Sequence, residues 1–264
     1  MRRRDGETRF AQRRKGAKAD ARKKMKVSLF ITCLVDQFFP EVGMSVVSVL
    51  RKQGVEVEFP KDQTCCGQPA FNSGFTTEAR DLAKRFVEIF ENSEYVVAPS
   101  GSCTSMVRVF YPELLKDDPD WHKRAVSLAS RTYEFTEFLV NVLGVEDVGA
   151  YYQGKVALHQ SCHLLRELNV KTEPQRLLKT VKGIELVELE RSDSCCGFGG
   201  LFAIKYPHIS GSILQEKIDC IRKSGGDVVV ACDMGCLMHI GGGLSRQGDT
   251  TRTMHIAELL ASDA

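Results

Sequence analysis

Two stretches of the sequence, QTCCGQPA at residues 63–70 and DSCCGFGG at residues 193–200, each place two adjacent cysteines before a glycine. Such a pair is uncommon once in a chain, and its recurrence in the second half indicates an internal repeat. Glycine adopts backbone conformations that other residues avoid, so we expect each pair to lie on a tight turn. The two stretches therefore predict two copies of one thiol-bearing site.

The repeat extends beyond these turns. VSLFITC, which ends at Cys33, matches VALHQSC, which ends at Cys162. VVAPSGSC, which ends at Cys103, matches VVACDMGC, which ends at Cys236. All these matches have nearly the same offset along the chain, so insertions between the halves are few. Eight of the ten cysteines pair across the repeat, namely Cys33, Cys65, Cys66, Cys103, Cys162, Cys195, Cys196 and Cys236.

Each half also alternates short apolar runs with amphipathic stretches. The expected strands are KVSLFIT, VEVEF and YVVAP in the first half and KVALHQ, IELVEL and DVVVA in the second. Strands that alternate with helices predict parallel βαβ units. The fold class is therefore α/β, with two repeat-related lobes over residues 25–150 and 151–264. Residues 121–144 are predicted to form one helix that bridges the halves, with core positions at Leu128, Tyr133, Phe135 and Leu139.

The paired cysteines follow the carboxyl ends of the predicted strands in both halves. Open α/β sheets place their ligand sites at this edge. Thiols from distant parts of each half are therefore expected to meet at one end of one sheet. The sequence predicts two cysteine quartets, Cys33, Cys65, Cys66 and Cys103 in the first lobe and Cys162, Cys195, Cys196 and Cys236 in the second.

Charge divides the chain unevenly. Residues 1–24 hold 11 Lys and Arg against 3 Asp and Glu, whereas the rest holds 25 basic and 31 acidic residues. The first segment lacks apolar periodicity and is predicted to be a disordered basic leader. A translation start placed too early, with Met25 the natural start, is the favoured interpretation, and an arginine-rich targeting leader is the alternative. The mildly acidic remainder gives no reason to expect a nucleic-acid partner. No apolar run approaches the length of a membrane-spanning helix and no secretory signal is evident, so we expect a cytoplasmic protein without a membrane span.

Three kinds of site could use these thiols. Structural disulfides are rare in a reducing compartment, and the Cα atoms of adjacent cysteines, about 3.8 Å apart, are too close for an unstrained bridge. Structural zinc sites usually take ligands that are two to four residues apart. Adjacent thiols on a glycine turn can instead contact neighbouring irons of a larger cluster, so the spacing favours an iron–sulfur site in each half. A zinc-stabilised scaffold remains the alternative.

The succession of a single cysteine, Cys-Cys-Gly and another single cysteine resembles the cysteine-rich CCG domain. That domain occurs in tandem in the heterodisulfide reductase B subunit and in the iron–sulfur subunits of glycolate oxidase and anaerobic glycerol-3-phosphate dehydrogenase. Within this family the sequence is most similar to the lactate-utilization members. The motifs that carry the resemblance are LFITCLVD, CCGQPAFNSG, PSGSC, TYEFTEF, CCGFGG, GCLMHIGG and MHIAE.

The resemblance implies an iron–sulfur subunit of a cytosolic complex that oxidises L-lactate to pyruvate with two further subunits. A disulfide or another 2-hydroxy acid is the alternative substrate. No G-x-G-x-x-G follows a predicted strand and no ferredoxin-type cysteine run occurs, so partners are expected to supply the hydride acceptor. Heterodisulfide-reductase domains end in Cys-x-x-Cys, whereas Ser100 replaces the first of these cysteines here, and the cluster type stays open.

Five further residues are candidates for a role near the thiols. Cys232 is a candidate fifth ligand of the second half, while Cys220 is predicted to pack in the core as a small hydrophobe. His159 and His163 flank Cys162 and are expected to be ordinary structural or neighbouring histidines, with a hydrogen bond to cluster sulfur or a proton relay as the functional alternative. Arg166 is either a carboxylate-binding residue or a solvated helix arginine.

Overall fold

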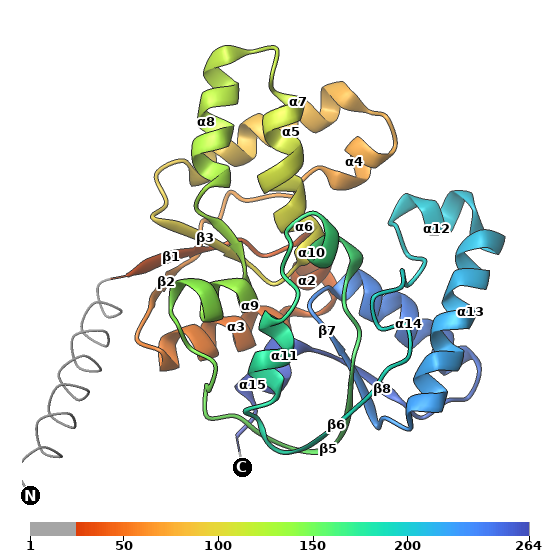
Figure 1. Cartoon of the computed structure of the whole chain (residues 1–264). Helices are drawn as coiled ribbons and strands as arrows, with labels where there is room; N and C mark the ends of the chain where they lie inside the picture. The colour runs from red at the N-terminus through yellow and green to blue at the C-terminus, as the bar shows by residue number, and fades with distance from the viewer. Residues whose placement is uncertain (1–24, 264) are drawn as a thin grey trace, which may run out of the picture.

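The computed structural model describes residues 25–263, and the predicted leader at residues 1–24 lies outside them. The chain forms two parallel four-stranded sheets of the same order (Figure 1). The first sheet, β2-β1-β3-β4, belongs to the first lobe, and the second, β6-β5-β7-β8, belongs to the second lobe. The strands are β1 Lys26–Leu29, β2 Glu56–Glu58, β3 Tyr95–Ala98, β4 Thr132–Glu134, β5 Tyr151–Leu158, β6 Lys182–Val187, β7 Val228–Ala231 and β8 Arg252–His255.

Helices connect the strands in the order that the repeat predicts. The first lobe holds α2 Cys33–Phe38, α3 Pro40–Lys52, α4 Gln68–Asn72, α5 Thr76–Phe90, α6 Gly101–Ser105, α7 Tyr111–Leu114, α8 Pro119–Ala129 and α9 Phe135–Glu137, with π-helical turns at Met106–Phe110 and Phe138–Val142. The second lobe holds α10 Cys162–Arg166, α11 Glu173–Leu178, α12 Leu201–Lys205, α13 Pro207–Ser224, α14 Met234–Arg246 and α15 Ile256–Ala261. The predicted α/β fold with two repeat-related lobes is confirmed, while the limits of the lobes at residues 150 and 151 stay a prediction.

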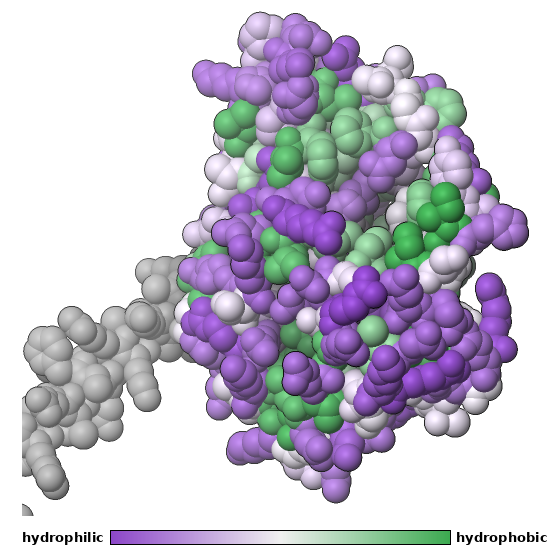
Figure 2. Space-filling model, turned by 45° about the vertical axis from the view of Figure 1, so that its right-hand side comes forward, coloured by the Kyte–Doolittle hydropathy of each residue, from purple (hydrophilic) through white to green (hydrophobic). Residues whose placement is uncertain are grey.

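The central strands form because both faces of each sheet are covered. Every residue of β7 is buried, as are the last three residues of β3, which is typical of parallel strands between helical layers. Helix α3 of the first lobe packs against α15 of the second, and one apolar core runs through both lobes. Hydrophilic side chains cover most of the face seen in Figure 2, and no helix within residues 25–263 is long and apolar enough to span a membrane.

The single bridging helix predicted over residues 121–144 is wrong. Helix α8 ends at Ala129, and β4 follows before the chain turns helical again. Thr132 and Tyr133 favour an extended backbone, and β4 pairs in parallel with β3. Pairing with a neighbouring strand thus overrides the local helical pattern. Of the predicted core positions, Leu128, Phe135 and Leu139 are fully buried and Tyr133 is half-buried.

A fourth strand in each lobe extends the repeat further than the sequence suggested. Strand β4 and the helix after it read TYEFTE, and β8 and its following helix read TMHIAE. Glu134 and His255 occupy the same place, because each side chain accepts a backbone N–H of the helix that it precedes. The two lobes therefore share all four strands and the helix that ends each unit.

Candidate metal centre

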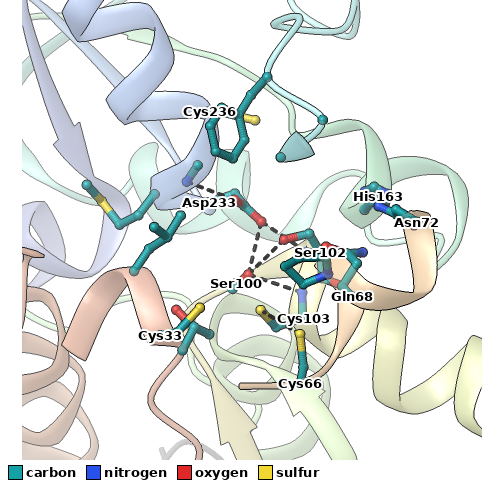
Figure 3. A pocket seen from close by; sticks show the side chains of 18 of the residues that line it. Cys33, Cys66, Gln68, Asn72, Ser100, Ser102, Cys103, His163, Asp233 and Cys236 are labelled. Carbon is teal, nitrogen blue, oxygen red and sulfur yellow. Dashed lines mark hydrogen bonds between the residues drawn. The ribbon is translucent and has the colours of Figure 1, made fainter. Parts of the chain in front are cut away.

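All eight paired cysteines line one cavity of about 300 Å³ between the lobes (Figure 3). Cys33 and Cys162 are the first residues of α2 and α10, which follow β1 and β5. Cys103 and Cys236 lie in the first turns of α6 and α14, which follow β3 and β7. The adjacent pairs lie in the loops after β2 and β6. Both sheets thus direct their carboxyl ends, and the thiols that follow them, toward the same space.

A glycine turn orients each adjacent pair. Gly67 and Gly197 have φ angles of 82° and 90°, which side chains other than glycine rarely adopt. A Cβ at Gly197 would also lie 2.7 Å from the carbonyl oxygen of Ser210. The backbone N–H of Gly67 donates to Sγ of Cys65 at 3.4 Å, and that of Gly197 donates to Sγ of Cys195 at 3.3 Å. The turn therefore positions the sulfur of the first cysteine and also stabilises its anionic form.

In the first quartet, Sγ of Cys66 lies 3.4 Å from Sγ of Cys103. Hydrogen bonds from the thiols of Cys33 and Cys66 lower the pKa of Cys65 to about 3. The pKa of Cys66 is raised, chiefly by its hydrogen bond to Cys103 and then by its bond to Cys65 and by burial. In the first quartet, the sulfur of Cys65 is therefore favoured as a thiolate, which the neighbouring thiols stabilise by hydrogen bonds.

The second quartet repeats this arrangement. Sγ of Cys196 lies 3.1 Å from Sγ of Cys236. Hydrogen bonds from Cys162 and Cys196 lower the pKa of Cys195 to about 2, and a hydrogen bond from Cys196, followed by one from His159, lowers the pKa of Cys236 to about 6. None of the cysteines in the described residues forms a disulfide. Each quartet thus offers free, converging sulfur donors, and the first cysteine of each adjacent pair has a lowered pKa, which favours the thiolate that metals require.

The capping residues of two helices join the lobes at the wall of the cavity. Ser100 precedes α6, and Asp233 precedes α14 at the equivalent place. The hydroxyl of Ser100 and the backbone N–H of Ser102 both donate to Oδ2 of Asp233, each at 3.0 Å (Figure 3). Sequence reasoning noted Ser100 only as a missing cysteine. Its role as a cap would follow from its place between a strand and a helix, but its contact with the other lobe would not.

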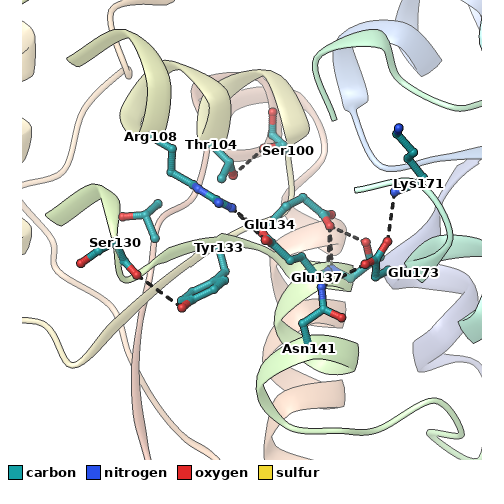
Figure 4. A network of polar contacts seen from close by, with 12 residues as sticks. Ser100, Thr104, Arg108, Ser130, Tyr133, Glu134, Glu137, Asn141, Lys171 and Glu173 are labelled. Carbon is teal, nitrogen blue, oxygen red and sulfur yellow. Dashed lines mark hydrogen bonds and ion pairs between the residues drawn. The ribbon is translucent and has the colours of Figure 1, made fainter. Parts of the chain in front are cut away.

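A second polar network lies around the helical turn after β4 and reaches the second lobe, where Glu173 accepts from Nδ2 of Asn141 at 2.9 Å (Figure 4). Nη1 of Arg108 donates to both carboxylate oxygens of Glu137, at 2.9 and 2.7 Å. The carboxylate of Glu134 accepts the backbone N–H of Thr136 at 2.7 Å, and its other oxygen has no hydrogen-bond partner among the described residues. Arg108, Glu134 and Glu137 do not line the cavity, so their contacts serve the fold rather than the thiol site.

The two unpaired cysteines lie away from the cavity. Cys220 is buried on α13 in an apolar cluster, as predicted. Cys232, the candidate fifth ligand, is 1% exposed and does not line the cavity. Burial raises the pKa of its thiol, with a further contribution from Glu134, and it hydrogen-bonds with Thr136. The side chain of Cys232 is turned toward the first lobe, and four cysteines of each half line the cavity.

The three remaining candidate residues, two histidines and one arginine, lie in different places relative to the cavity. His163 lines the cavity beside Cys162. His159 is buried behind the sulfurs, with a ring nitrogen within 4.8 Å of Sγ of both Cys196 and Cys236. Arg166 is exposed and outside the lining, which contradicts a carboxylate-binding role for it in this cavity. Lining residues that the sequence did not identify include Gln68, Asn72, Ser102, Phe198 and Asp233.

Comparisons with known proteins agree with this architecture. A family profile described as a cysteine-rich domain (CCG) matches residues 27–108 and 156–241. Lactate utilization protein A of Bacillus subtilis (strain 168) is 52% identical over 238 residues, which are 90% of this chain and 100% of that protein. Lactate utilization protein A 2 of Bacillus cereus (strain AH820) is 51% identical over 237 residues, 90% of this chain and 98% of that one.

A solved structure shows the same fold at low sequence identity. A hypothetical protein from Helicobacter pylori superposes with a TM-score of 0.62 at 12% identity, over 91% of this chain and 49% of that one. This likeness concerns the fold alone. The two segments matched by the family profile and the relatives that are about half identical over nearly their whole length show that the chain belongs to the cysteine-rich CCG domain family, in the group of the lactate utilization A proteins.

Proposed function

We propose that each quartet holds an iron–sulfur cluster and that the chain is a redox subunit of a complex that oxidises L-lactate to pyruvate. One observation carries the proposal. Eight free thiols, duplicated by the repeat, line a single cavity at the carboxyl ends of two sheets. When bound, such clusters accept and release single electrons at potentials that the surrounding hydrogen bonds and charges adjust.

The donor set fits a cluster better than a single zinc ion. Each quartet contains adjacent cysteines, whose sulfurs bind one small ion less readily than neighbouring irons of a larger group. The sulfur of the second cysteine of each pair lies within 3.4 Å of the sulfur of Cys103 in α6 or of Cys236 in α14. The first cysteine of each pair accepts a backbone N–H from the glycine turn. The residues present therefore supply four sulfur donors and a hydrogen bond to the resulting negative charge.

Lactate as the substrate of the complex comes from the relatives, which are named for lactate utilization. Conversion of L-lactate to pyruvate releases two electrons and two protons. No lysine or arginine is among the described residues that line the cavity, so the fork that usually holds a carboxylate is missing there. Partner subunits are therefore expected to bind lactate and take its hydride, while this chain carries electrons onward in single steps.

The experiment compares the chain alone with the assembled complex. The purified chain is expected to give negligible lactate-dependent reduction of an artificial acceptor, and co-expression with its partner subunits is expected to restore it. Cys66→Ser and Cys196→Ser should each abolish this activity, because each removes one cluster ligand. Cys220→Ser, which changes a thiol outside the cavity, is the matched control and should retain it.

Two results would contradict the proposal. Robust lactate oxidation by the single purified chain would refute the role as a dependent subunit. Full activity of the complex with both Cys66→Ser and Cys196→Ser would refute a redox role for the quartets. Anaerobically purified protein that is colourless and holds zinc would replace the proposal with the scaffold alternative.

A further inference from the structure

The two lobes differ in the residue that lies behind each quartet. His159 in the second lobe occupies the place of Phe30 in the first, three residues before Cys162 and Cys33 respectively. Equivalent backbone hydrogen bonds fix this correspondence. The N–H of His159 donates to the carbonyl oxygen of Val230 at 2.8 Å, and that of Phe30 donates to the carbonyl oxygen of Val97 at 2.9 Å.

His159 is 1% exposed, and its ring lies against the second quartet. Its Nδ1 lies 3.2 Å from the carbonyl oxygen of Ser192, whereas Nε2 has no hydrogen-bond partner among the described residues. One ring nitrogen lies within 4.8 Å of Sγ of both Cys196 and Cys236. Because the ring is absent from the cavity lining, it approaches these sulfurs from the side that faces away from the cavity. That placement suits a hydrogen bond to sulfur.

Phe30 offers nothing comparable to the first quartet. Its ring is fully buried and packs edge-on against Phe86, with ring centroids 4.7 Å apart, and against Phe90 at 5.9 Å. The phenyl ring has no donor for a sulfur atom. The first quartet therefore has an apolar wall where the second has an imidazole.

The partners of His159 determine which atoms carry hydrogen. A backbone carbonyl oxygen only accepts, so Nδ1 must donate to Ser192. A metal-bound thiolate also only accepts, so a nitrogen that faces one must be an N–H group. A ring that donates on both sides carries hydrogen on both nitrogens and is an imidazolium cation, so it also brings a positive charge to the second quartet. Such a donor stabilises the extra negative charge that reduction places on a cluster and its sulfurs, without transferring a proton.

We propose that His159 donates a hydrogen bond to the sulfur of Cys236 and thereby gives the second quartet's cluster a higher reduction potential than the first. The inference rests on the proposed function, since it needs a cluster in each quartet. It makes the two lobes unequal, with the incoming electron held preferentially in the second lobe. His159 acts through Cys236 and is a positioning residue, not a ligand.

The test is an anaerobic redox titration of the loaded chain, followed by electron paramagnetic resonance. Cys66→Ser serves as the background that assigns the remaining signal to the second quartet. His159→Phe, which copies the first lobe, should shift the reduction equilibrium of that signal about tenfold toward the oxidised form, or about 59 mV for one electron. His159→Gln, which keeps an N–H donor but not the positive charge, should recover part of this shift. His122→Phe is the matched control, because His122 also faces a carbonyl oxygen, that of Pro112 at 2.9 Å, but lies on α8 outside the cavity lining.

The outcomes separate this inference from the proposed function. Unchanged potential in His159→Phe, with full iron content, would overturn the inference and leave the clusters in place. Loss of iron from the second quartet in both His159 variants, with loss of nitrogen hyperfine coupling, would overturn it by showing that His159 is a ligand. Wild-type chain that binds no iron and sulfide would overturn the proposed function, and the inference with it.

Discussion

The first and second lobes hold their cysteine pairs by the same turn but support that turn differently. In the first lobe the hydroxyl of Tyr111 donates to the carbonyl oxygen of Cys66 at 2.8 Å. In the second lobe the much smaller Ser210 donates to the carbonyl oxygen of Gly197 at 2.8 Å. The repeat therefore keeps the sulfur donors and their glycine turns, while the residues behind them differ. The duplication explains why both lobes have the same number of sulfur donors. The residues that differ between the lobes give each quartet a different electrostatic environment.

The largest expected effect concerns Glu134 and His255, which take the same place in the two lobes. Burial raises the pKa of Glu134 from 4.5 to about 8 and lowers the pKa of His255 from 6.5 to about 4. The folded state thus binds the Glu134 proton more tightly than the unfolded state, so this contribution to stability is complete below pH 4.5 and is lost as the pH rises through 8. The contribution of His255 is complete above pH 6.5 and is lost as the pH falls through 4.

Denaturant unfolding at several pH values tests whether Glu134 and His255 give stability opposite dependences on pH. Relative to wild type, Glu134→Gln should remove the loss of stability between pH 4.5 and 8, and His255→Asn should remove the loss between pH 6.5 and 4. Each pKa unit corresponds to about 1.4 kcal/mol, so each difference should reach a few kcal/mol. Parallel pH profiles for both variants and wild type would show that neither buried group is linked to folding.

A smaller effect tests the contact between the lobes. A Cβ at Gly101 of α6 would lie 2.7 Å from Cβ and 3.1 Å from the backbone nitrogen of Leu164, in α10 of the other lobe. Gly101→Ala must therefore move one lobe against the other and should destabilise the chain by about 2–3 kcal/mol. Gly211→Ala is the matched control, because no atom lies within 4 Å of its added Cβ, and it should stabilise α13 by roughly 0.5–1 kcal/mol. Equal unfolding midpoints for the two variants would contradict close packing of the lobes.

The hydroxyl groups of Tyr111 and Ser210, which hydrogen-bond to the two turns, should contribute similar and moderate amounts to the free energy of unfolding. Tyr111→Phe and Ser210→Ala each leave a buried carbonyl oxygen without its hydrogen bond, at a cost of roughly 1–2 kcal/mol. The comparison is sharpened by measuring iron retention on mild denaturation, where each variant should release iron first from its own lobe. Release in the same order from both variants would mean that the hydroxyl groups do not support the turns independently.

The smallest effect is expected for the thiols that the repeat leaves unpaired. Cys220→Ser places a hydroxyl in an apolar cluster and should cost about 1 kcal/mol. Cys232→Ser should cost less, because Thr136 can hydrogen-bond with the new hydroxyl as it does with the thiol. Iron content should be unchanged in both. Loss of iron from Cys232→Ser would make Cys232 a fifth ligand after all.

The sequence could predict features that are encoded locally or duplicated. Buried runs such as VVVA at β7 identify the central strands, and cysteines that follow such runs predict two quartets at one sheet edge. Strand β4 could not be recognised in this way, because three residues carry little periodicity and its identity depends on pairing with β3. Cys232 points toward the first lobe and away from the cavity, and Ser100 contacts Asp233 of the other lobe. Both features depend on how one lobe packs on the other. No local pattern specifies that packing.

The most direct test of the central claim is the iron and acid-labile sulfide content of the anaerobically purified chain and three variants. If the quartets hold clusters independently, Cys66→Ser and Cys196→Ser should each retain about half of the wild-type iron and sulfide, since each loses a ligand of one site. The double variant should retain almost none, and each single variant should lose a different paramagnetic signal. Full iron and sulfide in the double variant, or complete loss in either single variant, would contradict two separate four-cysteine centres.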